Sequence, residues 1–189
     1  MTRCGSFCAR AGGLAGYWVL DRYPQSDRRG WFERLYCGQE LRSLGHPGVL
    51  AQVNRSRTSA VGTIRGLHGQ RPPWAEWKLV TCLRGAVMDV VADLRPGSDT
   101  YLQYRSVQLA ADDPSSVLVP PGCVHGFQTL EAECEMLYLH SHPHVPAAEF
   151  GVRWDDPALA IEWPLPCALL SQRDSTFPNL AEGAGGGGR

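Results

Sequence analysis

Short β-type segments recur along most of this chain, and their spacing limits the possible fold more than any other feature of the sequence. They are rich in apolar residues, follow one another at roughly ten-residue intervals, and are separated by turns that contain Gly or Pro. This pattern predicts an all-β protein, either a sandwich or a barrel, with a short helix at residues 38–44. The expected strands are residues 17–23, 31–36, 49–54, 62–68, 78–83, 86–94, 101–109, 117–119 and 134–139.

The two ends of the chain differ in composition from the middle. Residues 1–16 are small and Gly-rich, so we expect a flexible N-terminal arm that is poorly ordered. Residues 181–189 consist mainly of Gly, and we expect a flexible tail there. Residues 17–180 then form a single domain, which is long enough to bury a full core.

The overall composition argues against several classes of partner. The formal net charge is −1, which gives no reason to expect binding to nucleic acid or to a membrane surface. No apolar run approaches the roughly 18 to 20 residues that cross a bilayer. The seven Cys are odd in number and no two have CxxC spacing. We therefore expect reduced thiols, no zinc site and a cytoplasmic location.

The stretch from Gly62 to His68 contains the first candidate functional residues. Arg65 and His68 are three positions apart, so a regular strand would point them to opposite faces. Gly66 lies between them and can interrupt the pleat as a bulge. A bulged strand would aim a cation and an imidazole into one cavity, whereas a regular strand would leave Arg65 on the surface.

A second His follows a tight turn formed by Pro120 and Gly122. The spacing from Pro120 to His125 resembles the second motif of the cupin superfamily, whose members place this His inside a jelly-roll barrel. In metal-binding cupins the first motif supplies two further His and a Glu. The corresponding region here offers only His68, so a cupin metal site lacks ligands.

Three more His occupy every second position near the C-terminal end of the strand region. His140, His142 and His144 would share one strand face, where imidazoles can bind a transition metal. A polar loop beside Pro143 explains the same spacing. A metal-dependent cupin oxygenase or isomerase that uses His125 with His140 or His142 is therefore one alternative function.

A barrel that contains His68 and His125 brings other reactive groups near them. Lys78 lies in an apolar strand, and Tyr138 follows Met136 and Leu137. Tyr138 is equally consistent with an ordinary core aromatic. A pocket with cations, two imidazoles and a phenol suits the removal of a proton next to a carbonyl group. A base takes the proton, cations stabilise the enolate, and the phenol returns a proton from the other face.

Taken together, these motifs resemble the dTDP-4-dehydrorhamnose 3,5-epimerase family. The similarity extends from Asp27 to Pro178 and preserves the spacing between motifs. The resemblance implies a cupin-type jelly roll, usually a homodimer. It also implies epimerisation of a dTDP-4-keto-6-deoxyhexose in deoxysugar biosynthesis, without a metal or cofactor. The motifs are Gln52-x-Asn54, Ile64–His68, Lys78–Val80, Arg84-Gly85, Asp89–Ser98, Pro120–Phe127 and Gly151–Pro157.

The resemblance also implies roles for individual residues. By position, His68 would be the base, Asp174 the carboxylate that orients it, Tyr138 the acid and Lys78 the cation that stabilises the enolate. Contacts to the sugar, the phosphates or the nucleotide are implied for Arg29, Gln52, Asn54, Arg65, His125, His144, Glu149 and Arg173.

Three positions depart from the family pattern and border the pocket. His144 and Gly69 stand where aromatic residues are common, and Arg34 stands where the family tends to have Glu. Such changes bear on which carbon is epimerised, so a single-centre 3- or 5-epimerase is an alternative. Two further alternatives are a 3,4-ketoisomerase and a protein that binds the sugar nucleotide without turnover.

Overall fold

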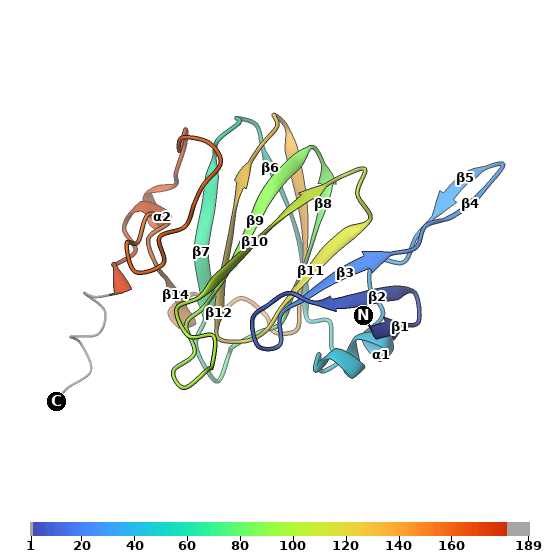
Figure 1. Cartoon of the computed structure of the whole chain (residues 1–189), viewed down its shortest axis with the longest axis horizontal. Helices are drawn as coiled ribbons and strands as arrows, with labels where there is room; N and C mark the ends of the chain where they lie inside the picture. Colours follow the sequence, from blue (N-terminus) through green and yellow to red (C-terminus); the bar gives the residue numbers. More distant parts are fainter. Residues whose placement is uncertain (1, 181–189) are drawn as a thin grey trace.

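The computed structural model describes residues 2–180 and consists mostly of β-strands and loops (Figure 1). Its helical segments are α1 (Gly38–Leu41), η1 (Arg42–Leu44), η2 (Pro146–Ala148) and α2 (Gln172–Ser175). Its strands are β1 (Thr2–Cys4), β2 (Phe7–Ala11), β3 (Trp18–Arg22), β4 (Gln25–Asp27), β5 (Gly30–Phe32), β6 (Gln52–Thr58), β7 (Ile64–Gln70), β8 (Lys78–Arg84), β9 (Ala86–Asp93), β10 (Tyr104–Ala110), β11 (Ser115–Val119), β12 (Cys123–Thr129), β13 (Cys134–His140) and β14 (Glu149–Gly151).

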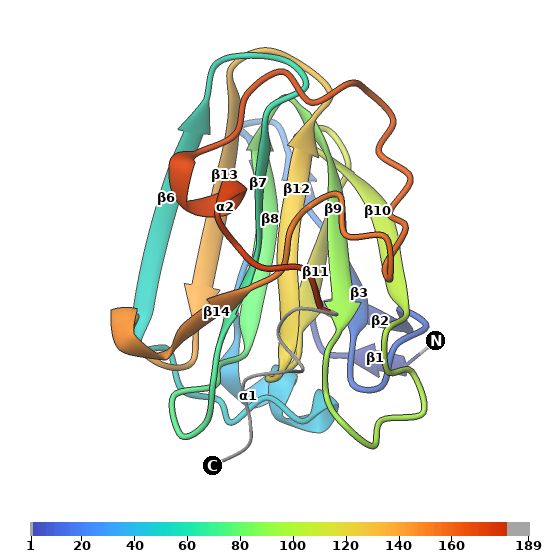
Figure 2. The ribbon, with the colours of Figure 1, turned by 90° about the vertical axis from the view of Figure 1, so that its left-hand side faces the viewer.

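Two antiparallel sheets face each other and enclose the interior of the domain (Figure 2). One sheet has seven strands in the order β1-β2-β3-β11-β8-β13-β6, and the other has five in the order β10-β9-β12-β7-β14. Neighbours in each sheet are mostly distant in sequence, so the chain crosses repeatedly from one sheet to the other. This confirms the predicted all-β fold, a cupin-type jelly roll.

Apolar side chains from both sheets fill the space between them. Val80 and Met136 from the seven-stranded sheet belong to one buried cluster with Val91, Leu109 and Phe127 from the five-stranded sheet. All five are at most 1% exposed. Full burial of such a side chain stabilises a fold by roughly 1.5–3 kcal/mol, so this cluster is a major source of stability.

Strand pairing brings the candidate residues onto neighbouring positions. β12 pairs with β7 so that His125 lies opposite His68, and β13 pairs with β6 so that Tyr138 lies opposite Asn54. Because side chains alternate along a strand, His140 points to the same side of β13 as Tyr138. The register therefore gathers polar side chains from both sheets inside the jelly roll.

The N-terminal residues differ from the prediction of a poorly ordered arm. β1 pairs with β2, and β2 pairs with β3 at the edge of the seven-stranded sheet. Phe7 and Ala9 are fully buried and belong to a cluster with Leu20 and Leu118. Phe7 and Ala9 alternate with the less buried Cys8 and Arg10, and this alternation is typical of a half-buried strand. The predicted tail at 181–189 lies outside the described residues.

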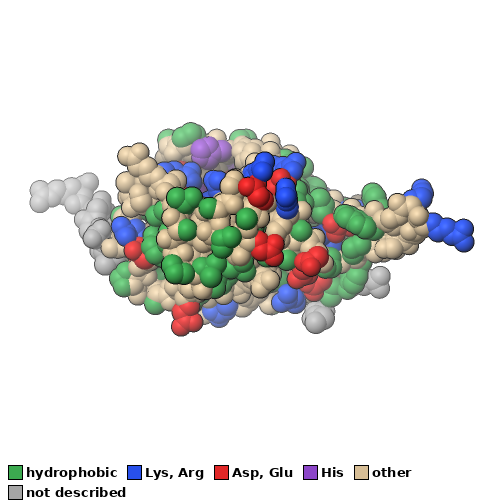
Figure 3. Space-filling model, turned by 90° about the horizontal axis from the view of Figure 1, so that it is seen from above, with side chains coloured by type: hydrophobic (Ala, Val, Ile, Leu, Met, Phe, Trp, Pro, Cys, Tyr) green, Lys and Arg blue, Asp and Glu red, His purple; other side chains and the backbone are tan. Residues whose placement is uncertain are grey.

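The strand predicted at 31–36 is instead part of a small hairpin. β4 and β5 form a separate two-stranded sheet that projects from the body of the molecule (Figure 1). Trp31 and Phe32 on this hairpin are 68% and 70% exposed. Basic side chains lie at its tip (Figure 3). The hairpin thus presents large apolar and basic side chains to the outside of this chain.

Several boundaries shift by a few residues, among them the two described next. The predicted helix at 38–44 divides into α1 and η1, and it ends at Gly45, which has a left-handed φ of 93°. The strand predicted at 49–54 begins at Gln52 and continues to Thr58. No helix in the described part of the chain is long and apolar enough to cross a membrane.

Candidate active site

A cleft inside the jelly roll contains most of the candidate residues. It consists of two adjoining cavities of about 250 Å³ each, which share His68, Lys78, Asn54, His140 and Arg173 in their walls. The remaining residues of the first cavity are Arg55, Ser56, Arg65, His125, Phe127 and Tyr138. Those of the second are Gln52, Gly69, Gln70, Glu76, His144 and Glu149.

A bulge at Gly66 lets Arg65 and His68 line the same cavity. The β12–β7 register shifts between His125 and Phe127, opposite this point. Gly66 has a φ of 110°, and a Cβ there would lie 2.6 Å from the His125 carbonyl oxygen. Only Gly fits this conformation and this close approach. The predicted interruption of the pleat is therefore confirmed.

The imidazole of His68 lies among positive charges. Burial lowers its pKa well below the ordinary value of 6.5, and the nearby Lys78, Arg173, His125 and His144 lower it further. Its Nδ1 atom is buried without a hydrogen-bond partner among the described residues. His68 is therefore a neutral imidazole near neutral pH, which is the protonation state that a general base requires.

Asp174, the carboxylate that the family resemblance assigns to orienting His68, has other hydrogen-bond partners in this structure. Asp174 lies on α2 and is 1% exposed. Its Oδ2 accepts a hydrogen bond of 3.0 Å from the Gly66 amide, and its Oδ1 accepts one of 2.9 Å from Arg173 Nε. Both carboxylate oxygens are thereby engaged. In this structure Asp174 holds the bulge and the Arg173 guanidinium rather than the His68 ring.

The second His of the cleft has a carboxylate partner, which the spacing of the sequence motifs did not indicate. His125 Nε2 lies 2.6 Å from Asp89 Oδ2, and Asp89 on β9 is fully buried. This contact fixes the orientation of the His125 ring inside the sheet. An acidic residue within the Val-rich run 86–94 was the available signal, because a buried acid needs a partner.

The phenol of Tyr138 faces the same cavity. Its hydroxyl lies 2.9 Å from Ser56 Oγ, and its ring lies edge-on to His125 with centroids 6.5 Å apart. Burial raises the pKa of Tyr138 to about 12, against the opposing effects of Ser56 and Arg65. The phenol therefore keeps its proton near neutral pH and can act as an acid.

Lys78 is the only lysine in the sequence, and it points into the cleft as predicted. Its Nζ donates a hydrogen bond of 3.3 Å to the carbonyl oxygen of His68, and it lies 3.3 Å from Glu76 Oε1. Burial lowers the pKa of Lys78, whereas the charge of Glu76 opposes this effect. The ammonium group therefore contacts the His68 backbone and the Glu76 carboxylate, and it lines the same cavity as the His68 imidazole and the Tyr138 phenol.

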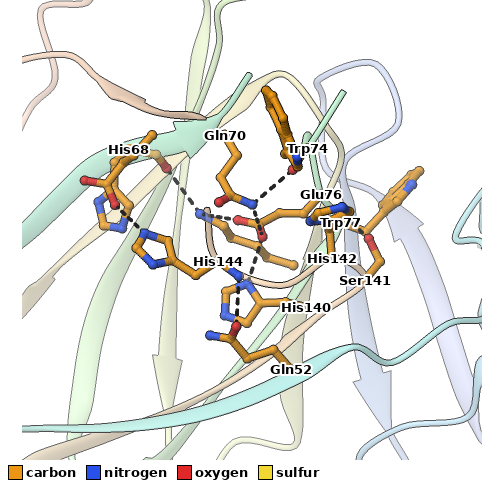
Figure 4. A network of polar contacts seen from close by, with 12 residues as sticks. Gln52, His68, Gln70, Trp74, Glu76, Trp77, His140, Ser141, His142 and His144 are labelled. Carbon is orange, nitrogen blue, oxygen red and sulfur yellow. Dashed lines mark hydrogen bonds and ion pairs between the residues drawn. The ribbon is translucent and has the colours of Figure 1, made fainter. Parts of the chain in front are cut away.

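Several of the predicted substrate-binding residues line the second cavity, where Gln52 and His144 belong to one polar network (Figure 4). Gln52 Oε1 accepts a hydrogen bond of 2.9 Å from the His144 amide. Glu149 Oε2 lies 3.1 Å from His144 Nε2 and 3.2 Å from Arg173 Nη1. His144, which replaces an aromatic residue, thus forms polar contacts on both sides of this cavity. Asn54 completes the wall between the two cavities.

Arg29 does not line the cavities described above. It lies at the turn of the β4–β5 hairpin, and its side chain is 90% exposed and paired only with the neighbouring Asp27 among the described residues. Arg34, another departure from the family pattern, pairs with Glu40 at 2.6 Å and lies outside the cleft. Within one chain, these two residues are therefore separate from the acid–base groups.

The three alternating His do not converge on one point. His140 contacts Glu76, His142 Nδ1 lies 2.9 Å from the Pro143 carbonyl oxygen, and His144 contacts Glu149. In the described part of the chain, no three His, Cys, Asp or Glu side chains lie close enough to hold a metal ion. The expectation of one shared strand face fails because β13 ends at His140.

Gly69 is explained by close packing around β7. A Cβ at this position would lie 2.8 Å from the Cys123 carbonyl oxygen and 3.4 Å from the Phe150 ring. Phe150 lies on β14, directly opposite Gly69 in the register, and its ring contacts the Arg71 guanidinium at 5.0 Å. Close packing against Cys123 and Phe150 thus accounts for Gly at position 69.

Comparison with known proteins agrees with this geometry. The model of the dTDP-4-dehydrorhamnose 3,5-epimerase family matches residues 12–182. A dTDP-4-dehydrorhamnose 3,5-epimerase from Sinorhizobium fredii is 40% identical over 157 residues, which cover 82% of this chain and 80% of that protein. A dTDP-4-dehydrorhamnose 3-epimerase from Streptomyces niveus is 40% identical over 171 residues, which cover 90% and 82%.

A solved structure shares the whole fold. It is a 4-keto-6-deoxy sugar epimerase from the novobiocin biosynthetic gene cluster of Streptomyces spheroides. It is 38% identical, with a TM-score of 0.89, and the alignment covers 98% of this chain and 93% of that chain. The sequence motifs, the jelly roll and these similarities lead to one conclusion: the chain belongs to the dTDP-4-dehydrorhamnose 3,5-epimerase family.

Proposed function

We propose that this protein epimerises a dTDP-4-keto-6-deoxyhexose at a carbon next to the C4 ketone. The observation that supports this most directly is the arrangement of three groups in one cleft. A neutral imidazole, His68, can accept a proton, a protonated phenol, Tyr138, can donate one, and the Lys78 ammonium lies beside them. Such a set suits proton abstraction next to a carbonyl group.

The proposed reaction needs two proton transfers. His68 takes the proton from C3 or C5, and the electron pair of the broken C–H bond moves into an enolate with its negative charge on the C4 oxygen. Lys78 stabilises this charge, which in a buried site is worth more than in water. Tyr138 then donates its proton to the opposite face of the same carbon, and exchange with solvent restores both residues.

The other residues of the cleft hold the substrate in this proposal. Arg65 and Arg173 carry guanidinium groups that match phosphate oxygens in a bidentate way. His125, oriented by Asp89, contacts the sugar. The polar walls formed by Gln52, Asn54, His144 and Glu149 contact the sugar and the nucleotide.

Arg29 fits this function only if two copies of the chain associate. The hairpin that carries it projects away from its own domain and exposes Trp31 and Phe32 (Figure 1). We therefore propose a homodimer in which each hairpin reaches the cleft of the partner.

The described cysteines at positions 8, 37, 82, 123, 134 and 167 are all free, which supports a reducing, cytoplasmic location.

A single-centre epimerase is the second candidate. The relative from Streptomyces niveus is named as a 3-epimerase, whereas that from Sinorhizobium fredii is named as a 3,5-epimerase, and both are 40% identical to this chain. His144 and Gly69 change the wall of the cavity in which the sugar would turn to present its second carbon.

Deuterium exchange tests the proposal and separates the two candidates. The protein is incubated with dTDP-4-keto-6-deoxyglucose in heavy water, and NMR locates the label in the sugar. Label at C3 and C5 indicates the double epimerase, and label at one carbon indicates the single-centre enzyme. A carbonyl that moves from C4 to C3 would indicate a ketoisomerase. Substrate binding without any exchange would contradict the proposal.

A further inference from the structure

Glu76 is a buried carboxylate in the cleft that the proposed proton transfers do not use. It lies just before β8 and is 7% exposed. Its Oε1 lies 3.3 Å from Lys78 Nζ. Its Oε2 accepts a hydrogen bond of 2.9 Å from Gln70 Nε2 and lies 3.4 Å from His140 Nδ1 (Figure 4). Three side chains from three different strands therefore meet at one carboxylate.

An acid at this place needs an explanation, because the proposed substrate is itself anionic. A buried, uncompensated carboxylate is unfavourable and would repel both the phosphates and the enolate. Burial raises the pKa of Glu76, but the hydrogen bond with His140 and the charge of Lys78 outweigh this effect and lower it. Glu76 is thus ionised, and its charge is balanced within the protein.

The positive charge of Lys78 depends on the Glu76 carboxylate more than on any other side chain. Burial favours its neutral amine, and among the groups that favour the ammonium form Glu76 has the largest effect, followed by Glu149. Arg173 acts in the opposite direction. The titratable and charged groups that share the cleft with Lys78 are His68 on β7, Glu76 before β8, His125 on β12, Tyr138 and His140 on β13, His144, Glu149 on β14, Arg65 on β7, Arg55 on β6 and Arg173 on α2.

The second partner of Glu76 is stacked on the catalytic phenol. The rings of His140 and Tyr138 lie 6.3 Å apart at an angle of 26°. His140 Nε2 lies 3.4 Å from Asn54 Nδ2. With its proton on Nδ1, His140 donates to Glu76 and accepts from Asn54, so both ring nitrogens have partners. The imidazole is thereby held in a stacked arrangement beside Tyr138, whose hydroxyl lies within hydrogen-bonding distance of Ser56.

We propose that Glu76 is a positioning residue of the active site, which keeps the Lys78 ammonium charged and holds the His140 ring against Tyr138. This inference rests on the proposed epimerase function. Glu76 does not exchange a proton with the substrate in this scheme. It acts through the group that stabilises the enolate and through the ring that supports the acid.

The single lysine makes a direct test possible. Protein labelled with ¹³C and ¹⁵N in lysine alone gives one side-chain signal, and its pH titration reports Lys78. Glu76→Gln keeps the size and hydrogen-bonding capacity of the side chain but removes its charge. We expect the titration midpoint of Lys78 to move to lower pH by roughly one pH unit or more. The loss of activity at alkaline pH moves in the same direction, and kcat at pH 8 falls by about tenfold or more.

Two variants serve as controls. Glu131→Gln makes the same change at an exposed position outside the cleft and should leave both the titration and kcat unchanged. Glu76→Asp retains the charge and should retain most of the Lys78 midpoint, even where the shorter side chain lowers kcat. If Glu76→Gln leaves the Lys78 midpoint unchanged, or moves it without moving the alkaline limb of the kcat profile, the proposal is wrong.

A second pair of variants tests the contact with Tyr138 and does not depend on the folding of Glu76→Gln. His140→Phe keeps a ring against the phenol, whereas His140→Ala removes it. We expect kcat of His140→Ala to fall by about tenfold, with much of the loss restored in His140→Phe. Equal rates in both variants would overturn this part. The lysine titration needs no turnover, so wild-type protein that fails to exchange substrate protons refutes the epimerase function separately.

Discussion

The strands β7 and β12 each present a histidine to the same cleft at directly opposed positions, but the two imidazoles have different surroundings. His125 on β12 lies 2.6 Å from the buried carboxylate of Asp89. His68 on β7 has no partner for Nδ1 within residues 5–180, and cations surround it. Position in the sheet therefore does not determine the role of a histidine. The neighbouring charges make His68 suitable as a base and keep His125 in a fixed orientation.

Removing each imidazole is the strongest test of this difference. We expect His68→Asn to lower the rate of deuterium incorporation into substrate by about 10²- to 10⁴-fold, the usual contribution of a general base. His125→Asn should cost less, because His125 positions the substrate in this scheme. The measurement is solvent exchange followed by NMR, with His142→Asn as a control outside the cleft. A larger loss for His125→Asn than for His68→Asn would reverse the assignment.

The different surroundings of the two histidines can also be tested by removing Asp89, the carboxylate that contacts His125. Asp89→Ala leaves His125 Nε2 buried without this partner. Loss of a buried hydrogen-bond partner lowers the free energy of unfolding by about 1–3 kcal/mol. Urea denaturation measures this change, and Asp112→Ala at an exposed position should be neutral within experimental error. A stability of Asp89→Ala equal to that of the wild type would show that the pair contributes little.

Much of the fold and of the cleft could be predicted from the sequence, because the relevant signals are local. The turn residues and apolar segments indicated most of the strands, and Gly66 indicated the bulge that brings Arg65 and His68 together. Asp89 was missed because its partner lies 36 positions away on another strand. A pairing between distant strands depends on the register, which the pattern of one strand does not determine.

The regions that were predicted less well depend on contacts made elsewhere in the chain. β1 and β2 are stabilised by pairing with β3 and by burial of Phe7 and Ala9, and a Gly-rich composition does not reveal these contacts. The partners of Asp174 could not be predicted for a similar reason. Gly66 and Arg173 use both carboxylate oxygens, and these donors are apparent only once α2 lies beside β7.

Asp174 offers a third and smaller test of how His68 is held. In Asp174→Asn the amide NH₂ group faces a donor, either the Gly66 amide or the Arg173 guanidinium. One hydrogen bond is then lost, and the bulge beside His68 loosens. We expect kcat to fall by about tenfold, as misplacement of a catalytic group costs one to two orders of magnitude. A loss as large as that of His68→Asn would indicate that Asp174 acts directly on the imidazole during turnover.

The smallest expected effect is the contribution of His68 to the pH dependence of stability. Its pKa in the folded protein lies well below the ordinary value of 6.5, so the unfolded chain binds a proton at a higher pH than the folded chain does. This contribution is fully present above pH 6.5 and is lost as the pH falls toward the folded pKa, at no more than about 1.4 kcal/mol per pH unit.

Comparing wild type with His68→Asn isolates this term. His46, whose pKa burial lowers to about 4, contributes in the same direction in both proteins, so its effect cancels in the difference. We expect the free energy of unfolding of the wild type to fall more steeply than that of the variant between pH 6.5 and pH 5, in urea denaturation at matched ionic strength. Parallel curves would mean that His68 titrates normally in the folded protein. In that case the two opposed histidines would differ only in their partners, and the neutral state of His68 would no longer distinguish it as the base.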